Sequence, residues 1–280
     1  KRAFDMMNGG KPFASRKLMG ELLSRAETGF DGKLIITSMN LADQERTVEV
    51  VRRELARGAR HRHAGRGVGV HHAMRVRDIE TGDGNAQISF LVCEPLEQAG
   101  FINAFSTRGG GVSEFPAHAL NLAYFKGDDK KNVAENRRRF LEAIGVSAAA
   151  TVMTARQTHS IDRCFVETLE QARGPQPDCD AMATKLSGVL LAIQTADCLP
   201  VLIADPKSGA TAGIHAGWRG TAGRITERAV ADLLALGVNP RDCIAALGPS
   251  ACAECYEVGE DVIGRFQKEF GYWNKLLTNA

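Results

Sequence analysis

The stretch IQTADCLPVLIADPKSGATAGIHAGWRG, residues 193–220, decides how we interpret the fold of this chain. Two apolar runs flank a break at DPKSG, which is typical of two neighbouring β-strands joined by a turn. Asp197 and Cys198 interrupt the first run, and His215 stands near the end of the second. Polar side chains at strand ends cost burial energy unless they have partners. These three residues are therefore candidates for a functional site.

Outward from this stretch, short apolar runs alternate with amphipathic segments. Such a pattern predicts an α+β fold with mixed α/β packing. Residues 108–124, RGGGVSEFPAHALNLAY, read as a long glycine-bearing loop. Helices are predicted over residues 128–146, 223–238 and 259–270, and strands over residues 86–96, 100–108, 150–160, 162–167, 188–196, 199–205, 209–216 and 242–250.

Residues 1–77 differ from the rest of the chain. They contain two helical patterns and one short strand pattern, followed by RGARHRHAGRGVGVHHAMRVR at residues 57–77. This basic stretch indicates a solvated linker, with a histidine metal tract or a nucleic-acid patch as alternatives. It has no interleaved aromatic side chains, which argues against nucleic acid. We therefore expect an N-terminal extension at residues 1–77 and a single catalytic domain at residues 78–280.

Charge, cysteine spacing and the first residues of the chain bear on its partners, its disulfides and its location. The net charge is +2 and 24% of residues are charged, so charge alone favours neither nucleic acid nor a membrane as a partner. The seven cysteines have no regular spacing and their number is odd, which argues against a disulfide framework. The start of the chain shows no signal-peptide pattern, so we expect a cytoplasmic protein. Cys252 and Cys255 form a C-x-x-C pair without a second pair to complete a four-cysteine zinc site.

Three soft metal ligands, His159, Cys198 and His215, stand at the ends of apolar runs. Imidazole and thiolate suit zinc or copper, and three protein ligands leave one tetrahedral position open, as catalytic zinc sites require. Cys198 and His215 could instead form a nucleophile pair, with Asp197 or another carboxylate as the orienting group. The residues alone leave both interpretations open.

Other polar residues stand in similar settings. Arg108 precedes three glycines and Arg219 lies between a tryptophan and a glycine, and either guanidinium suits a phosphate or carboxylate. A salt bridge that fixes a loop is the alternative for both. Asp178 and Asp180 are candidates for hydrogen-bond partners of a ligating histidine, or for turn formers after Pro177.

Eight motifs occur in order between residues 105 and 262: FSTRGGGVS, LNLAYFKGDD, VAENRRRF, RQTHS, DCDAMAT, TADCLPVLI, HAGWRGTAGRI and GPSACAECYEVGEDV. In this order they resemble the YfiH-type family, whose members have been labelled multicopper polyphenol oxidases or laccase domains, and the resemblance covers about residues 88–270. The resemblance implies a metal centre at His159, Cys198 and His215, and a mixed α/β sandwich related to cytotoxic-necrotising-factor catalytic domains. It also implies a zinc-dependent purine nucleoside phosphorylase with adenosine deaminase activity. The expected partners are thus a nucleoside and phosphate, with Arg108 as a candidate for the anion or substrate contact.

The chain departs from the family pattern at both ends. Residues 1–77 have no counterpart, and members usually continue beyond the end of this chain, so we expect a C-terminally truncated domain. A copper-dependent phenol oxidase is the alternative function, and copper the alternative metal. Laccase chemistry needs about ten His and Cys ligands. The chain has seven histidines, four of them in the basic stretch, and this number of potential copper ligands is too small, so zinc is favoured.

Overall fold

The computed structural model describes residues 74–81, 87–114, 118–124, 127–146, 150–251 and 256–277. The elements predicted before residue 74, and the Cys252–Cys255 pair, lie outside these residues. The chain forms two compact units, one of residues 1–94 and 104–145, the other of residues 95–103 and 146–280. The sequence predicted a single catalytic domain, and the proposed boundary at residue 77 stays a prediction. Each unit is described by itself below.

The described residues of the first unit form an antiparallel sheet and the helix α5. A buried cluster of Ile88, Phe90, Val92 and Leu120 forms its core, and the ring of Phe140 meets Phe90 edge-on at a centroid distance of 6.1 Å. The strands run in the order β1-β2-β3. The elements of this unit are β1 (Met74–Glu80), β2 (Gln87–Cys93), β3 (Phe105–Ser106), β4 (Gly109–Ser113) and α5 (Lys130–Ala143), and α4 (Glu94–Gln98) begins at its end.

Two segments of this unit differ from the prediction. The basic stretch was expected to be a linker throughout, but it enters β1 at Met74 and pairs with β2 over seven residues. The glycine-bearing stretch was expected to be a loop, but it begins with β4. There the chain packs backbone against backbone, because a Cβ on Gly111 would lie 2.1 Å from the carbonyl oxygen of Ala119. Glycine is what allows this close approach.

Asn136 of α5 holds β4 in place, which explains the VAENRRRF motif in structural terms. Its side chain is fully buried and accepts a hydrogen bond from the Val112 amide at 2.8 Å. It donates to Ser113 Oγ at 2.9 Å and to the Asn121 carbonyl at 2.9 Å. A buried amide that is satisfied in this way fixes one arrangement of its neighbours.

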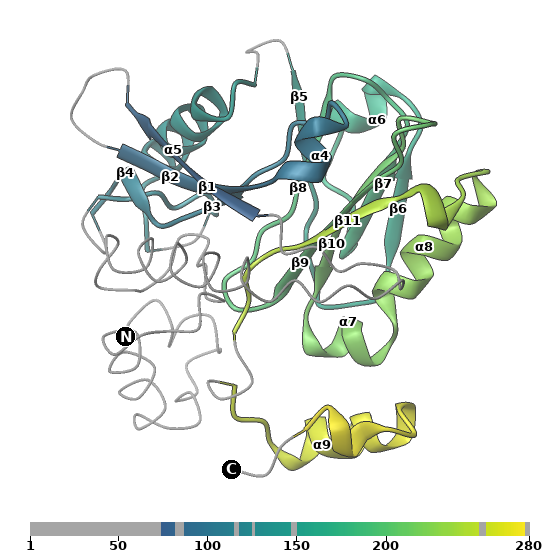
Figure 1. Cartoon of the computed structure of the whole chain (residues 1–280). Coiled ribbons are helices and arrows are strands. Elements are labelled where there is room, and N and C mark those ends of the chain that lie inside the picture. Colours follow the sequence, from purple (N-terminus) through teal and green to yellow (C-terminus); the bar gives the residue numbers. More distant parts are fainter. Residues whose placement is uncertain are drawn as a thin grey trace. The chain divides into compact units, whose positions relative to one another are not determined.

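The second unit is a five-stranded sheet in the order β11-β9-β10-β7-β6 (Figure 1). Neighbouring strands are antiparallel except β6 and β7, which are parallel. The sequence predicted four of these strands, β6, β9, β10 and β11, but did not predict β7 as a strand. The bounds are β6 (Arg163–Val166), β7 (Ala181–Thr184), β9 (Leu199–Ala204), β10 (Thr211–Ala216) and β11 (Ile244–Leu247).

Layers on the two faces of this sheet make a mixed α/β fold, as predicted. Helix α8 (Ile225–Ala235) packs its buried Ile225, Ala229 and Leu233 against one face. The parallel pair β5 (Thr151–Thr154) and β8 (Val189–Ala192) and the short helix α6 (Leu169–Arg173) contribute to a second cluster that contains Met182 of β7.

The alternation of side chains along β10 determines which face carries His215. Ala212, Ile214 and Ala216 belong to the cluster that packs against α8. Gly213 points the other way, since a Cβ there would meet the Ile193 side chain at 3.0 Å. Successive residues of a strand point to opposite faces, so His215 shares the face of Gly213. The histidine thus points towards the chain that leaves β8.

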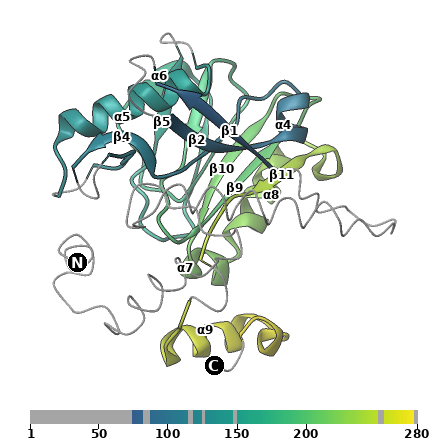
Figure 2. The ribbon, with the colours of Figure 1, turned by 60° about the vertical axis from the view of Figure 1, so that its left-hand side comes forward.

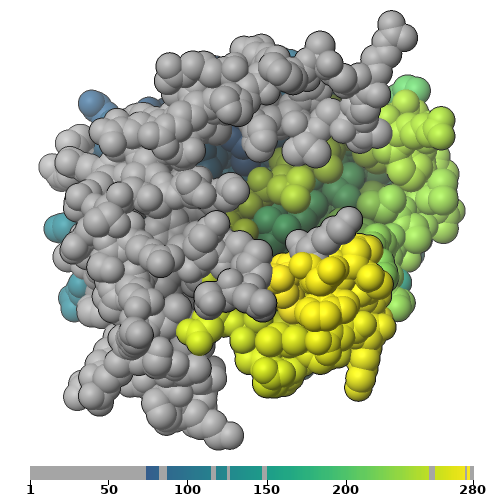
Figure 3. Space-filling view, turned by 60° about the horizontal axis from the view of Figure 1, so that its bottom comes forward, coloured from purple at the N-terminus to yellow at the C-terminus, as the bar shows by residue number. Residues whose placement is uncertain are grey.

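The C-terminal part of this unit begins with α7 (Trp218–Ala222), which follows β10 at the lower end of the sheet in Figure 2. Helix α9 (Glu260–Glu269) lies below it and packs Val262, Phe266 and Phe270 against Ala222. Figure 3 shows this segment in yellow beside the green residues of the same unit. Among the described residues of this unit, 3-10 turns lie at Pro240–Asp242 and Trp273–Lys275. Among the described residues, no helix combines the length and apolar character needed to cross a membrane.

Candidate metal centre

His159, Cys198 and His215 come together at one end of the second unit. One ligand atom from each, two imidazole nitrogens and a thiol sulfur, lies within 4.8 Å of the other two. The two imidazole rings meet edge-on, with centroids 4.9 Å apart. Ligands of one tetrahedral zinc ion lie about 3.5 Å apart, so binding requires a contraction of roughly 1 Å. Within the part of the chain that the structure describes, this is the one such group of His, Cys, Asp or Glu side chains.

The register of β9 and β10 brings Cys198 near His215. The antiparallel pair aligns His215 with Pro200 and Ala216 with Leu199. Cys198 directly precedes β9 and Gly217 directly follows β10, and a Cβ on Gly217 would lie 3.2 Å from Cys198 Sγ. Cys198 lies in a bend before β9, in the gap that the sequence left between the strands predicted at residues 188–196 and 199–205. A rigid hairpin therefore presents two of the three ligands from its open end.

A pair of amide hydrogen bonds places His159 beside this hairpin end. The Gln157 side chain donates to the carbonyl of Gln194 at 2.6 Å and accepts from the Gln194 amide at 2.8 Å. Gln157 follows β5 and Gln194 follows β8, and these two strands are parallel neighbours. The segment that leads to His159 is thus tied to the segment that leads to Cys198. His159 itself has a left-handed backbone, with φ of 59°.

Asp180 lies behind the two histidines and is fully buried. Its Oδ1 lies 2.7 Å from His215 Nδ1, and its Oδ2 accepts from the Ser160 amide at 2.7 Å. Burial alone would raise the pKa of Asp180, but the hydrogen bonds from His215, Ser160 and Thr158 outweigh it and lower the pKa. Asp180 is therefore a carboxylate. Of its two sequence interpretations, the partner of a histidine is the one that these contacts support.

The ionisation of Cys198 and His215 bears on the alternatives that the sequence left open. Burial raises the pKa of the Cys198 thiol to about 12, and the neighbouring Asp197 carboxylate adds to the shift. Burial lowers the pKa of His215, although its hydrogen bond to Asp180 opposes this. A nucleophile pair needs a thiolate stabilised by a cationic neighbour. A neutral imidazole beside a protonated thiol does not provide one, whereas a metal ion deprotonates a coordinating thiol outright.

Gly217 leaves the space that the three ligands need. A Cβ on this residue would lie 3.0 Å from His159 Cδ2, 3.2 Å from Cys198 Sγ and 3.7 Å from His215 Cε1. Two imidazole nitrogens and one thiol sulfur, with the space that Gly217 leaves between them, fit a soft or borderline metal ion such as zinc or copper. Sequence reasoning missed Gly217. The pairing of two strands that end at Cys198 and His215 was the signal that could have identified it.

Replacing Gly217 with alanine should weaken zinc binding about 10- to 100-fold, the usual effect of disturbing the immediate surroundings of a metal site. The new methyl group would displace the His159 ring and the Cys198 sulfur by a few tenths of an ångström. Competition with a chromophoric chelator measures the affinity. Gly264→Ala is the matched control, because a Cβ on that glycine meets nothing within 4 Å. Equal zinc affinity in both variants would show that Gly217 does not shape the site.

Further polar groups gather around Cys198. Asp197 is exposed, and its carbonyl accepts a hydrogen bond from the Ala251 amide at 3.0 Å. Burial raises the pKa of the Tyr256 hydroxyl to about 12, with contributions from Asp197 and Cys198. The hydroxyl therefore keeps its proton at neutral pH and can donate it in a hydrogen bond. Sequence reasoning did not single out Tyr256, although it lies in the CYEV part of a motif.

The remaining predicted residues are placed as follows. Arg219 is exposed, and its guanidinium lies over the Trp218 ring, 4.2 Å from the centroid. Asp178 forms an exposed ion pair with Arg156, so it is not a partner of the histidines. Arg108 belongs to the first unit, between β3 and β4, and its carbonyl accepts from the Leu120 amide. Its role as an anion contact stays a prediction.

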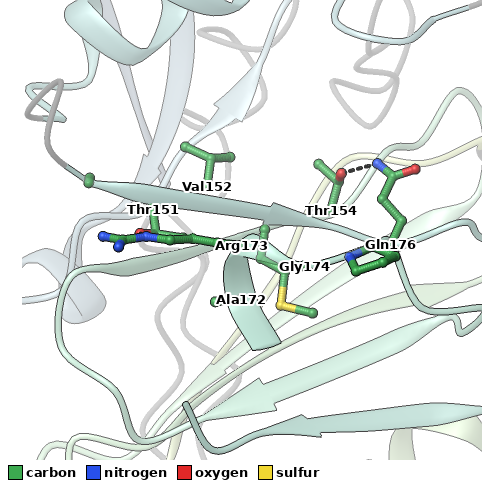
Figure 4. Close-up of a pocket in the computed structure, with 10 residues that line it drawn as sticks. Thr151, Val152, Thr154, Ala172, Arg173, Gly174 and Gln176 are labelled. Atoms are coloured by element: carbon green, nitrogen blue, oxygen red, sulfur yellow. Dashed lines mark hydrogen bonds between the residues drawn. The ribbon is translucent and has the colours of Figure 1, made fainter. Parts of the chain in front are cut away.

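A groove of about 440 Å³ lies elsewhere on the second unit, between β5 and the end of α6 (Figure 4). The Arg173 side chain donates to Thr151 Oγ1 at 3.1 Å, and Gln176 donates to Thr154. This groove contains no histidine, cysteine or carboxylate, so it offers no group for acid, base or metal chemistry. None of the predicted site residues lines it. Its lining consists of Ala150, Thr151, Val152, Met153, Thr154, Ala172, Arg173, Gly174, Pro175 and Gln176.

Proteins of similar sequence carry the names of nucleoside-processing enzymes. A protein from Deinococcus radiodurans named purine nucleoside phosphorylase is 44% identical over 172 residues. The match covers 61% of this chain and 65% of that relative, which is just under two thirds of its length. A prokaryotic protein named adenosine deaminase RL5 is 37% identical over 184 residues, with 63% of this chain and 70% of the relative covered.

Solved structures resemble the chain in fold. YfiH from Bacillus licheniformis, a hypothetical protein, superimposes with a TM-score of 0.63 at 28% identity, over 73% of this chain and 76% of the other. YlmD from Geobacillus stearothermophilus gives 0.59 at 31% identity, over 69% and 72% of the two chains. The model of the multi-copper polyphenol oxidoreductase laccase family matches residues 102–280. The chain therefore belongs to this laccase-like family, which the YfiH-type resemblance of its motifs had indicated.

Proposed function

We propose that the chain is a zinc-dependent purine nucleoside phosphorylase with adenosine deaminase activity. The observation that carries the proposal is the convergence of His159, Cys198 and His215 within 4.8 Å at the open end of a hairpin. Relatives named for both activities support it. Three protein ligands leave one position of a tetrahedral ion for water or substrate. A bound zinc ion would supply a Lewis acid that makes a water molecule acidic near neutral pH.

The surrounding residues have roles that their chemistry suggests. Asp197 is an exposed carboxylate beside Cys198 and can accept a proton from water or phosphate. Arg219 is an exposed guanidinium, and we assign it as a candidate to bind the phosphate. Arg108 of the first unit remains a separate candidate for an anion contact. Tyr256 can donate a hydrogen bond to the purine. In phosphorolysis a phosphate oxygen bonds to the anomeric carbon as the base departs, and in deamination water replaces the amino group, which leaves as ammonia.

The donor inventory favours zinc chemistry over laccase chemistry. A laccase combines a mononuclear copper with a trinuclear cluster and needs about ten His and Cys ligands. The described residues provide one group of three such ligands. Five described cysteines are free thiols, which suits a reducing compartment, so we also propose a cytoplasmic location.

The test uses purified protein that is freed of copper and loaded with zinc. Incubation with adenosine should give inosine, and addition of phosphate should release free base and ribose 1-phosphate, both resolved by chromatography. The Cys198→Ser variant, prepared in the same way, controls for contaminating enzymes. If the zinc form gives neither product while the copper form consumes oxygen with phenols, the proposal is wrong and the oxidase alternative is correct.

A further inference from the structure

We propose that Asp180 is a positioning residue that presets both histidine ligands before a metal ion binds. It fixes the proton of His215 on Nδ1, and it fixes the left-handed backbone of His159. The inference rests on the metal centre of the proposed function, but not on which reaction that centre catalyses. Its argument is the set of hydrogen bonds that converge on one buried carboxylate.

The first part of the argument concerns the tautomer of His215. Asp180 Oδ1 lies 2.7 Å from His215 Nδ1, and both side chains are buried. A carboxylate oxygen can only accept, so Nδ1 carries the proton and the lone pair of the neutral ring is on Nε2. Nε2 is thus the atom left to bind a metal. The opposite tautomer would place a hydrogen where the metal has to be.

The second part concerns the backbone that carries His159. Three successive amides, those of Thr158, His159 and Ser160, donate to the Asp180 carboxylate at 3.1, 3.0 and 2.7 Å. Such a run of amides around an anion is a backbone nest. The nest includes His159, whose φ of 59° lies in the left-handed region that non-glycine residues enter only at a cost in free energy. The carboxylate compensates for this strain and so determines where the His159 ring lies.

The same oxygen of Asp180 contacts the His215 ring and the His159 backbone, so we expect that a neutral isostere cannot replace Asp180. Oδ1 accepts from the His159 amide and from His215 Nδ1, while Oδ2 accepts from the amides of Thr158 and Ser160. An asparagine must turn its NH₂ group towards one set or the other. If the NH₂ group takes the place of Oδ1, it meets the His159 amide, which is also a donor, and it forces His215 into the wrong tautomer. If the NH₂ group takes the place of Oδ2, it meets the donor amides of Thr158 and Ser160 and opens the nest.

Asp205 provides a matched control in the same unit. It is a buried aspartate, 3% exposed, that accepts from the amides of Lys207 and Ser208 at 3.0 and 3.2 Å. It shapes the turn between β9 and β10, at the end of the hairpin away from His215. Asp205→Asn therefore removes the same charge from a comparable backbone environment without touching a histidine.

The experiment begins with the wild-type protein stripped of metal. Long-range ¹H–¹⁵N NMR correlations report which ring nitrogen of each histidine is protonated, and His215→Gln assigns its signals. We expect His215 to be protonated on Nδ1 in the absence of metal. Protonation on Nε2 would overturn the proposal, and this measurement requires no variant of Asp180.

The variants are then compared for zinc affinity by competition with a chromophoric chelator. Asp180→Asn should bind zinc about 10- to 100-fold more weakly than wild type, and should lose the pure Nδ1–H signal of His215. Asp205→Asn should keep its zinc affinity within twofold of wild type and should keep the Nδ1–H signal of His215, whatever its loss of thermal stability. Wild-type zinc affinity in Asp180→Asn, or an equal loss in both variants, would show that Asp180 is merely structural. These readouts involve no nucleoside, so failure of the proposed reaction would leave them unchanged.

Discussion

Replacement of Cys198 with serine should reduce nucleoside turnover to the background level and weaken zinc binding roughly 100- to 1,000-fold. Structural zinc sites with four ligands contribute about 10–16 kcal/mol in total, so one ligand accounts for some 3 kcal/mol. A serine hydroxyl does not ionise readily enough to replace a thiolate. The fold should survive, because Cys198 lies in a bend before β9 and outside the buried clusters. Zinc titration, product chromatography and thermal unfolding of the metal-free proteins measure the three effects.

Cys243→Ser is the control for this experiment. Cys243 is another half-buried free thiol of the same unit, beside the turn at Pro240–Asp242 and remote from the metal ligands in the sheet. It should keep its zinc affinity and its turnover. If instead Cys198→Ser unfolds, with no loss of activity separable from the loss of structure, the site stabilises the fold and has no catalytic role.

Replacement of Gly111 with alanine should destabilise the first unit by about 3 kcal/mol or more. A Cβ on Gly111 would lie 2.1 Å from the Ala119 oxygen and 2.5 Å from the Leu120 Cα. Both are backbone atoms, so the collision cannot be relieved by turning a side chain, and overpacking of this kind costs 1–3 kcal/mol even where relaxation is possible. Hydrogen exchange should show lost protection in β2 and β4.

The same variant should retain its zinc affinity, because all three ligands and Asp180 belong to the second unit. Gly145→Ala is the control in the first unit. Its φ of 72° makes alanine unfavourable by about 1 kcal/mol, but a Cβ there meets nothing within 4 Å. Equal stability of Gly111→Ala and Gly145→Ala would contradict the close packing of β4 against residues 118–120.

The centre of the second unit could be predicted from the sequence because its patterns are unambiguous. The runs that became β9 and β10 are too short and too continuously apolar for a surface helix, and a turn signal separates them. Helix α8 repeats its buried residues Ile225, Ala229 and Leu233 at intervals of four. The apolar runs of β9 and β10 and the spacing in α8 can be read locally, because the elements that bury them are neighbours in the sequence.

The missed strands depend on partners that are distant in sequence. Three successive glycines in β4 suggested a loop, and what makes them a strand is the close approach of residues 118–120. Met74–Glu80 begins inside the basic stretch of residues 57–77, and its pairing with Gln87–Cys93 defines it as β1. Propensity is a weak guide in strands, because pairing and packing override it.

For the site, the sequence predicted His159, Cys198 and His215 as candidate ligands, and it offered Asp178 and Asp180 alike as partners of a histidine without distinguishing them. Asp178 and Asp180 looked equivalent, since both follow Pro177. The two side chains differ in their surroundings because only Asp180 adjoins a strand. Asp180 directly precedes β7, and its backbone carbonyl accepts from the His215 amide at 2.7 Å, which carries its side chain into the sheet. Asp178 lies two residues earlier and forms an ion pair at the surface.

The left-handed backbone at His159 has a consequence for how the metal preference of this scaffold can evolve. Asparagine, aspartate and histidine are the side chains that enter this region most readily, and β-branched or bulky ones are excluded. Substitutions that preserve a ligand at this position therefore lead from imidazole towards oxygen donors, which suit harder cations such as manganese. A cysteine at position 159 would enter the left-handed region less readily than histidine does. Selection for a softer metal would meet this cost at position 159 but not at Cys198 or His215, whose φ angles are not positive.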